Sequence, residues 1–371
     1  MSPKAPRREA SIDVLRAFAI AFMVVVHFVE NLSGTYDSIH GPFEGISRIW
    51  WLPTGFAAPM FAFLSGVSYR LWNVSYERRG WTDHAITMCS IRRGVFLIVL
   101  GLAFNVLVWL PEDVFNWDIL TFVGCGLLAL AVARRMPDGV VLFAAALVIV
   151  VAPAMRNVSD YASYWTAGSY DYEFTLSDVV LGWLVTGYFP IFPWLAFPLV
   201  GFAAAPRLLS VSAQPMAIAA GLVAASTAVV TAWATMPLAV TGGTAGAWTM
   251  FPASTAYVLG TLGGTCLALA VMHWLLDGDE PRGRWLIAWA TPLSRHSLSL
   301  YLLHHVVHIW PLWVYGMATT GVATSHWQRV FPPAVAVSLA ALFLVGGSVL
   351  CHVAGRRRIP MAESLMRRLC D

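Results

Sequence analysis

The stretch 12–29, IDVLRAFAIAFMVVVHFV, has the length and hydropathy of a membrane helix, yet it carries an arginine and a histidine. Arg16 and His27 are eleven residues apart, so their side chains emerge from one helix face, about 16 Å apart along the axis. Asp13 and Glu30 fall near the same stripe, and we expect Asp13 to pair with Arg16. Ionisable groups at bilayer depth usually face a protein interior or a wet cavity, so this stripe predicts a functional site.

The composition is that of a polytopic membrane protein. Of the 371 residues, 58% are hydrophobic and 12% are charged, whereas about 25% of a soluble domain is charged. The five cysteines have no metal-ligand spacing, so we expect free thiols and no disulfide framework. The first apolar run is long and lacks a small-residue cleavage site, which indicates a retained helix and not a signal peptide. We therefore predict an all-α bundle in the bilayer, with no nucleic-acid partner.

Apolar runs predict about ten transmembrane helices, each near the roughly 20 residues that cross a bilayer. The prolines near 190–201 predict an irregular span, and the ninth span is long enough to be broken near Pro292. Without a repeat or a soluble segment, the chain is expected to form one domain, 1–371, with tails at 1–11 and 355–371. The predicted spans are 12–32, 53–73, 94–111, 118–134, 139–155, 189–206, 215–235, 254–276, 287–313 and 331–354.

The distribution of arginines predicts the orientation. Most of the 23 basic residues fall on one side of the predicted spans, and the opposite loops hold only Arg48, Arg156 and Arg329. By the positive-inside rule, both termini are cytoplasmic. Arg16 then lies near the cytoplasmic end of its helix, and His27 lies in the outer part. The preference for arginine over lysine is typical of a high-GC bacterial source, so we expect a bacterial inner membrane.

The predicted outer loops are rich in aromatic and acidic residues. Trp and Tyr are common at bilayer interfaces, and their rings also suit the faces of sugars. Trp51 in the first outer loop and Asp118 before the fourth helix are the candidate substrate contacts there. Asp118 also has a simpler interpretation, as the N-terminal cap of its helix.

Several residues on the cytoplasmic side are candidates for binding an anionic ligand. Arg92 and Arg93 stand at the entrance to the third predicted helix, where they either set the topology or bind phosphate with their guanidinium forks. Arg295 lies near the cytosol on the ninth helix. Ser65 belongs to the segment FAFLSG (61–66) of the second helix, whose small residues also permit close helix packing.

The ninth predicted helix carries three histidines, His304, His305 and His308, at roughly the depth of His27. His304 and His308 are i,i+4 neighbours, a spacing that suits a metal ion. No carboxylate or cysteine accompanies them in the motif, so we expect no metal. We predict instead that His304 and His305 line a polar substrate site beside His27.

These motifs resemble those of the transmembrane acyltransferases. RAFAIAFMVVVH (16–27), FAFLSG (61–66) and SLSLYLLH (297–304) are similar in arrangement and order to acyltransferase family 3. RRGVFLIVLGLAFN, NWDILTFVGCGLLALA and FPIFPWLAFPLVG look more like the related heparan-α-glucosaminide N-acetyltransferase-like branch. That branch typically has asparagine where this chain has His27, and a catalytic histidine in the next outer loop, near the position of His40.

The resemblance implies an O- or N-acyltransferase that moves an acyl group, usually acetyl, from cytoplasmic acyl-CoA. The acceptor would be a hydroxyl or amine of a sugar or glycoconjugate on the other side of the envelope membrane. His27 or His40 would be the base, because imidazole titrates near neutral pH. Arg16, Arg92 and Arg93 would bind the phosphates while the arm of CoA follows the first helix.

Two questions of mechanism and class stay open at this stage. The chain shows no serine-nucleophile motif, which favours direct transfer, with an acyl-histidine as the alternative. A transporter or flippase for an envelope lipid or sugar would use the same stripe as a translocation path, but it would more often show an internal repeat. The sequence leaves the oligomeric state open, with a homodimer as one option.

Overall fold

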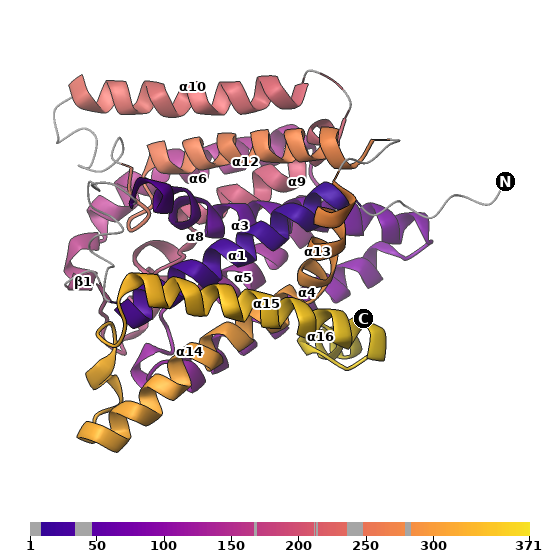
Figure 1. Cartoon of the computed structure of the whole chain (residues 1–371). Helices are drawn as coiled ribbons and strands as arrows, with labels where there is room; N and C mark the ends of the chain where they lie inside the picture. The colour runs from indigo at the N-terminus through magenta and orange to yellow at the C-terminus, as the bar shows by residue number, and fades with distance from the viewer. Residues whose placement is uncertain are drawn as a thin grey trace. The chain divides into compact units, whose positions relative to one another are not determined.

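The computed structural model describes residues 9–33, 47–166, 169–210, 212, 214–235, 248–278 and 283–371, apart from the side chains of 47–54 and 233–235. His40 lies outside the described residues. This part of the chain is helical, with one short antiparallel ladder in which Trp165 pairs with Tyr170 (Figure 1). The prediction of an all-α protein is confirmed.

The α-helices are α1 (Ala10–Ser33), α3 (Ser47–Arg78), α4 (Asp83–Val108), α5 (Ile119–Ala133), α6 (Asp138–Val158), α7 (Leu176–Leu181), α8 (Ile191–Trp194), α9 (Ala196–Leu208), α10 (Gln214–Thr235), α12 (Thr255–Leu276), α13 (Arg284–Arg295), α14 (Ser297–Thr320), α15 (Pro333–Arg357) and α16 (Ala362–Cys370). The tighter or wider turns are η1 (Pro111–Asp113), η2 (Tyr161–Tyr164), η3 (Gly182–Thr186) and η4 (Ala323–His326), and the strands are β1 (Trp165–Thr166) and β2 (Ser169–Tyr170).

Seven helical segments of the described chain are long and apolar enough to cross a membrane. They are Ala10–Ser33, Asp83–Val108, Asp138–Val158, Leu176–Leu208, Gln214–Ala232, Thr255–Leu276 and Pro333–Arg357. The other predicted spans correspond to α3, to the shorter apolar helix α5, and to the pair α13 and α14. The chain is thus a multi-pass membrane protein.

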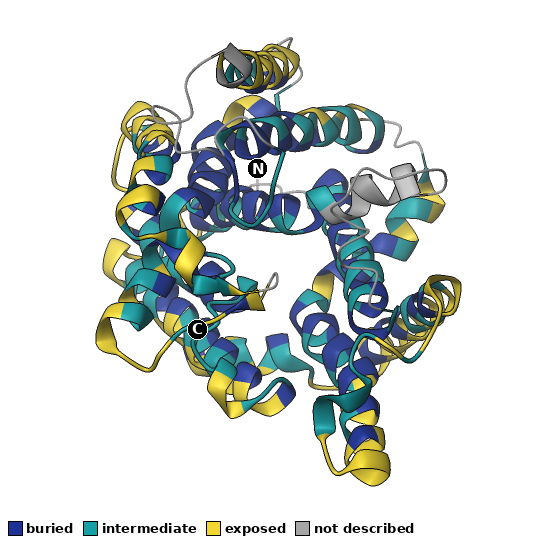
Figure 2. Ribbon diagram, turned by 90° about the vertical axis from the view of Figure 1, so that its left-hand side faces the viewer, coloured by how far each residue is buried: buried dark blue, intermediate teal, exposed yellow. Residues whose placement is uncertain are grey.

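Exposed apolar side chains support this conclusion. On α6 the exposed residues Val140, Phe143, Leu147 and Val150 recur at intervals of three and four, so they form one stripe. Contiguous apolar surface of this kind is unusual on a soluble monomer and suits contact with lipid. Figure 2 shows the same division on individual helices, which are buried on one side and exposed on the other.

Two predicted spans differ from the observed helices in instructive ways. α4 begins at Asp83, eleven residues before the predicted start, because the Thr82 side chain caps it by accepting from the Ala85 amide. Arg92 and Arg93 therefore lie well inside the helix and not at its entrance. The ninth span is broken, as expected, but the break falls at His296, between α13 and α14.

The chain divides into two compact units, of which the first comprises Ala62–Trp274 and Leu369–Asp371. Its helices pack closely where glycines meet backbone. A Cβ at Gly66 of α3 would lie 2.0 Å from the Pro198 carbonyl oxygen, and one at Gly201 would lie 2.2 Å from that of Phe63. Only glycine permits this approach, so the glycine of FAFLSG serves the packing of α3 against α9, as its small residues predicted.

The second unit comprises Glu9–Phe61 and Leu275–Arg368. In this unit α1 packs against α13, α14 and α15 (Figure 1). The start of α14 is capped from a distant part of the chain: the Ser299 amide and hydroxyl both donate to the carboxylate of Glu363 in α16. Since the first amides of a helix lack intrahelical partners, this carboxylate fixes the end of the helix that carries the histidines.

Candidate functional site

The end of the predicted stripe that carries Arg16 is a polar network in the second unit. Arg16 donates from Nη1 to the Ser294 hydroxyl at 3.0 Å, and that hydroxyl donates to Asp13 Oδ1 at 2.7 Å. Asp13 and Ser294 are both buried. Ser294 of α13 therefore links the two charged residues that the sequence predicted to pair, and it holds the Arg16 side chain in a defined direction.

The other half of the stripe is a cluster of three histidines from α1 and α14. The ring centroid of His27 lies 5.4 Å from that of His304 and 4.8 Å from that of His305. His27 Nδ1 also lies 3.6 Å from Glu30 Oε2. The His27 side chain is 32% exposed, whereas His304 and His305 are buried. The structure thus brings together the histidines that the depth argument had placed at one level.

Hydrogen bonds fix the tautomer of two histidines of α14. His304 Nδ1 lies 2.5 Å from the Tyr301 carbonyl oxygen and donates to it, which leaves Nε2 as the basic nitrogen. His308 Nδ1 donates to the His304 carbonyl in the same way. The His308 Nε2 accepts from the Asn31 side-chain amide at 2.9 Å, and the Asn31 oxygen accepts from the indole N–H of Trp327. His308 is thereby committed to a structural network.

The predicted phosphate ligands occupy different surroundings. Arg93 makes a forked contact with the carboxylate of Asp371, with nitrogen–oxygen distances of 2.7 to 2.9 Å, and its guanidinium lies 4.9 Å from the Trp72 ring centroid. Arg92 and Arg295 are exposed. Arg93 is therefore engaged within the first unit, while the other two arginines face outward.

The remaining predicted site residues either make hydrogen bonds within their own helix or have side chains outside the described part of the chain. Asp118 caps α5 by accepting from the Thr121 amide at 2.9 Å, in agreement with the simpler interpretation. The Ser65 hydroxyl donates to the Ala62 carbonyl of its own helix. Trp51 lies in α3, but its side chain is outside the described part of the chain. Their roles in binding substrate or CoA stay predictions.

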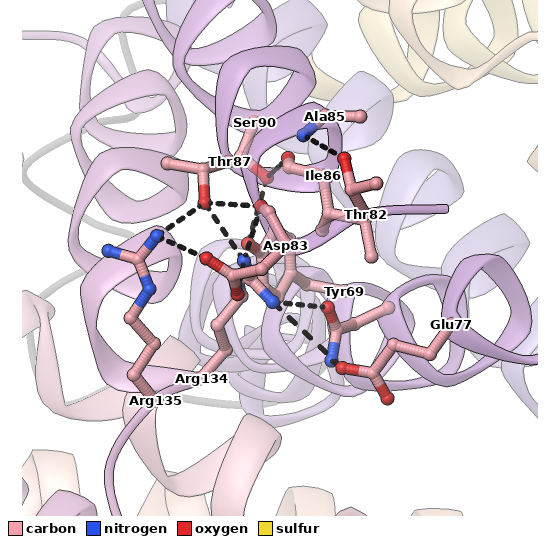
Figure 3. Close-up of polar contacts among 11 residues, drawn as sticks. Tyr69, Glu77, Thr82, Asp83, Ala85, Ile86, Thr87, Ser90, Arg134 and Arg135 are labelled. Atoms are coloured by element: carbon pink, nitrogen blue, oxygen red, sulfur yellow. Dashed lines mark hydrogen bonds and ion pairs between the residues drawn. The ribbon is translucent and has the colours of Figure 1, made fainter. Parts of the chain in front are cut away.

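The first unit holds a polar network that the sequence did not predict. Figure 3 shows Arg134 and Arg135 converging on Asp83 and Thr87 near the start of α4. The Arg134 side chain is only 3% exposed and also donates to Asn73. From the sequence, these arginines were expected only to set the orientation of the chain in the membrane. The run of two arginines after an apolar helix carried no signal for such a specific set of partners.

A second missed feature is the burial of Arg156, which the sequence presented as a loop charge. Its Nη2 donates to the Ala253 carbonyl, while Nε and Nη1 have no hydrogen-bond partner among the described residues. Nearby, burial raises the pKa of Tyr170 to about 12, so its hydroxyl stays protonated. Arg156 borders a small pocket with the aromatic residues Tyr161, Tyr188, Trp194 and Phe251.

The comparison with protein families decides what kind of protein carries these features. The family model for the catalytic part of heparan-alpha-glucosaminide N-acetyltransferase matches residues 8–236, more than half of the chain. The chain belongs to this family. It is therefore a membrane-bound, acetyl-CoA-dependent acyltransferase, as the resemblance implied. The match includes α1 with Arg16 and His27, and it ends before α14. A search of curated proteins finds no match.

Proposed function

We propose that this acyltransferase moves an acetyl group from cytoplasmic acetyl-CoA to a hydroxyl or amine of a sugar or glycoconjugate, with His27 as the general base. The observation that carries the proposal is the position of His27 in α1, beside the Glu30 carboxylate and two buried histidines of α14. We further propose that the enzyme lies in a bacterial inner membrane with both termini cytoplasmic.

The chemistry follows from the two nitrogens of His27. Glu30 Oε2 lies 3.6 Å from His27 Nδ1, so we propose the tautomer in which Nδ1 carries the proton and Nε2 keeps a lone pair. In direct transfer the acceptor oxygen or nitrogen attacks the thioester carbonyl carbon while His27 Nε2 takes its proton. The C–S bond then breaks, and the CoA thiolate recovers the proton from the imidazolium. Glu30 stabilises the imidazolium between these two steps.

The roles proposed for the arginines follow from their exposure. Arg16 lies on the same face of α1 as His27, about 16 Å from it along the helix axis. We therefore propose that Arg16 contacts the arm of CoA. Arg92 and Arg295 are exposed and suit the phosphates, to which a guanidinium binds as a fork. Arg93 binds phosphate only if Asp371 releases it, so Arg92 is the stronger candidate of the pair.

A carbohydrate acceptor is supported by the matching family, whose description names a glucosaminide as the group that receives the acetyl. We therefore propose an amino sugar or a related glycoconjugate as the acceptor.

The experiment compares His27→Ala with His40→Ala in proteoliposomes. CoA thiol release is measured with acetyl-CoA and a mixture of amino sugars, hexoses and glycolipids. We expect His27→Ala to lower kcat by 10²- to 10⁴-fold, the usual contribution of a general base, with acetyl-CoA affinity retained. Full activity in His27→Ala together with loss in His40→Ala would transfer the role to His40. The exposed His352 of α15 supplies the matched control, His352→Ala.

A further inference from the structure

The cluster of three histidines could bind a transition-metal ion, in addition to supplying the general base. One ring nitrogen from each of His27, His304 and His305 lies within 4.8 Å of the others. The sequence-based expectation of no metal considered the pair His304 and His308 within one helix. The structure commits both nitrogens of His308 elsewhere and supplies His27 from α1 instead.

We propose that His27, His304 and His305 bind a zinc-like divalent transition-metal ion, and that this ion inhibits acyl transfer by occupying the nitrogen of the base. The binding part of the proposal stands on the cluster alone. The inhibitory part rests on the proposed function of His27.

The available nitrogens support metal binding. The buried Nε2 of His304 has no hydrogen-bond partner among the described residues, and its Nδ1 is tied to the Tyr301 carbonyl. His27 likewise has Glu30 beside its Nδ1. Histidines that bind metals almost always donate from the other nitrogen to a carbonyl or carboxylate, as His304 does, and Glu30 lies near enough to His27 to take that role after a small movement.

The geometry requires only a small movement. Metal–nitrogen bonds of about 2.0–2.1 Å in a tetrahedral site place the nitrogens roughly 3.3 Å apart, so the cluster closes by about 1.5 Å. His304 is held by its backbone contact, whereas the His27 side chain is 32% exposed and can rotate. The fourth position is left to water.

A negative charge beside the cluster also favours binding of a divalent metal ion. A dication at membrane depth needs a compensating negative charge, which three neutral imidazoles do not supply. The Glu30 carboxylate, 3.6 Å from His27 Nδ1, supplies one negative charge. Imidazole nitrogens suit Zn²⁺, Co²⁺, Ni²⁺ and Cu²⁺ and not Mg²⁺ or Ca²⁺, which prefer oxygen ligands.

The binding test uses Co²⁺ as the probe with the metal-stripped full-length protein in detergent. We expect one equivalent of Co²⁺ to give the visible bands of a tetrahedral nitrogen site and Zn²⁺ to displace it. His304→Ala and His305→Ala should each weaken binding by at least about 100-fold, Glu30→Gln by about 10-fold, and the control His352→Ala should not change it. Absence of Co²⁺ bands in the wild type, or equal bands in His304→Ala, would overturn the site.

The inhibition test measures acetyl transfer with and without Zn²⁺, relative to the zinc-free rate of each protein. We expect Zn²⁺ to inhibit the wild type and His352→Ala, and to have little effect on His305→Ala at the same concentration. Saturating Co²⁺ and Zn²⁺ binding without inhibition would keep the metal site and refute His27 as the base. Inhibition that persists in His305→Ala would refute this site as the inhibitory one.

Discussion

The substitution Ser294→Ala tests whether the hydrogen bonds that link Asp13 and Arg16 through Ser294 stabilise the second unit. It removes one hydrogen bond of 2.7 Å to a buried carboxylate and one of 3.0 Å from a guanidinium. Side-chain hydrogen bonds between membrane helices contribute about 0.6 kcal/mol each on average and up to about 1.7 kcal/mol. Because both partners are charged, we expect a total loss of roughly 1–3 kcal/mol in the free energy of unfolding.

The assay is reversible unfolding in mixed micelles with increasing SDS. Ser338→Ala, on the exposed side of α15, removes only a hydroxyl that donates to its own helix and should change the free energy by less than about 0.5 kcal/mol. Ser294→Thr keeps a hydroxyl and should recover part of the loss. Equal values for Ser294→Ala and Ser338→Ala would show that the link contributes nothing. A loss of stability in Ser294→Thr as large as that in Ser294→Ala would mean that packing, and not the hydroxyl, is responsible.

Two further predictions concern packing and pH. Gly66→Ala should destabilise the protein by about 1–3 kcal/mol, because the new Cβ would lie 2.0 Å from the Pro198 carbonyl oxygen. Gly221 has open space around it, so the control Gly221→Ala should be neutral or stabilising by up to about 1 kcal/mol. The same SDS titration measures both, and equal effects would refute the close approach. Burial raises the pKa of Asp113, so the folded state holds its proton more tightly than the unfolded state and stability falls as pH rises from about 4 through the raised pKa. Asp113→Asn should remove that fall, and thermal unfolding from pH 4 to 7 that is parallel in the two proteins would contradict it.

The positions of the helices were largely predictable, because long apolar runs specify both their existence and their approximate ends. The irregular span also followed from its prolines, and the π-helical turn Gly182–Thr186 precedes α8 and α9 there. The start of α4 could not be predicted from the sequence, because residues 83–93 are polar enough to resemble a loop. A capping threonine and helix packing within the first unit extend the helix through it.

The candidate site was predictable only in part. A common depth placed His304 and His305 beside His27, and the helical period aligned Arg16 with it. Ser294 and Asp13 are 281 residues apart, and Glu363 caps a helix that begins 66 residues earlier. Contacts over such separations depend on how the helices pack, and no local pattern in the sequence specifies them.

The central claim is that His27 removes the proton from the acceptor, and chemical rescue tests it most directly. The rate of CoA thiol release by His27→Ala is measured with increasing imidazole, which can enter because the His27 side chain is one-third exposed. We predict a rate 10²- to 10⁴-fold below that of the wild type without imidazole, and a saturable, pH-dependent recovery with it. A His27→Ala protein that transfers acetyl groups at the wild-type rate without imidazole would contradict the claim.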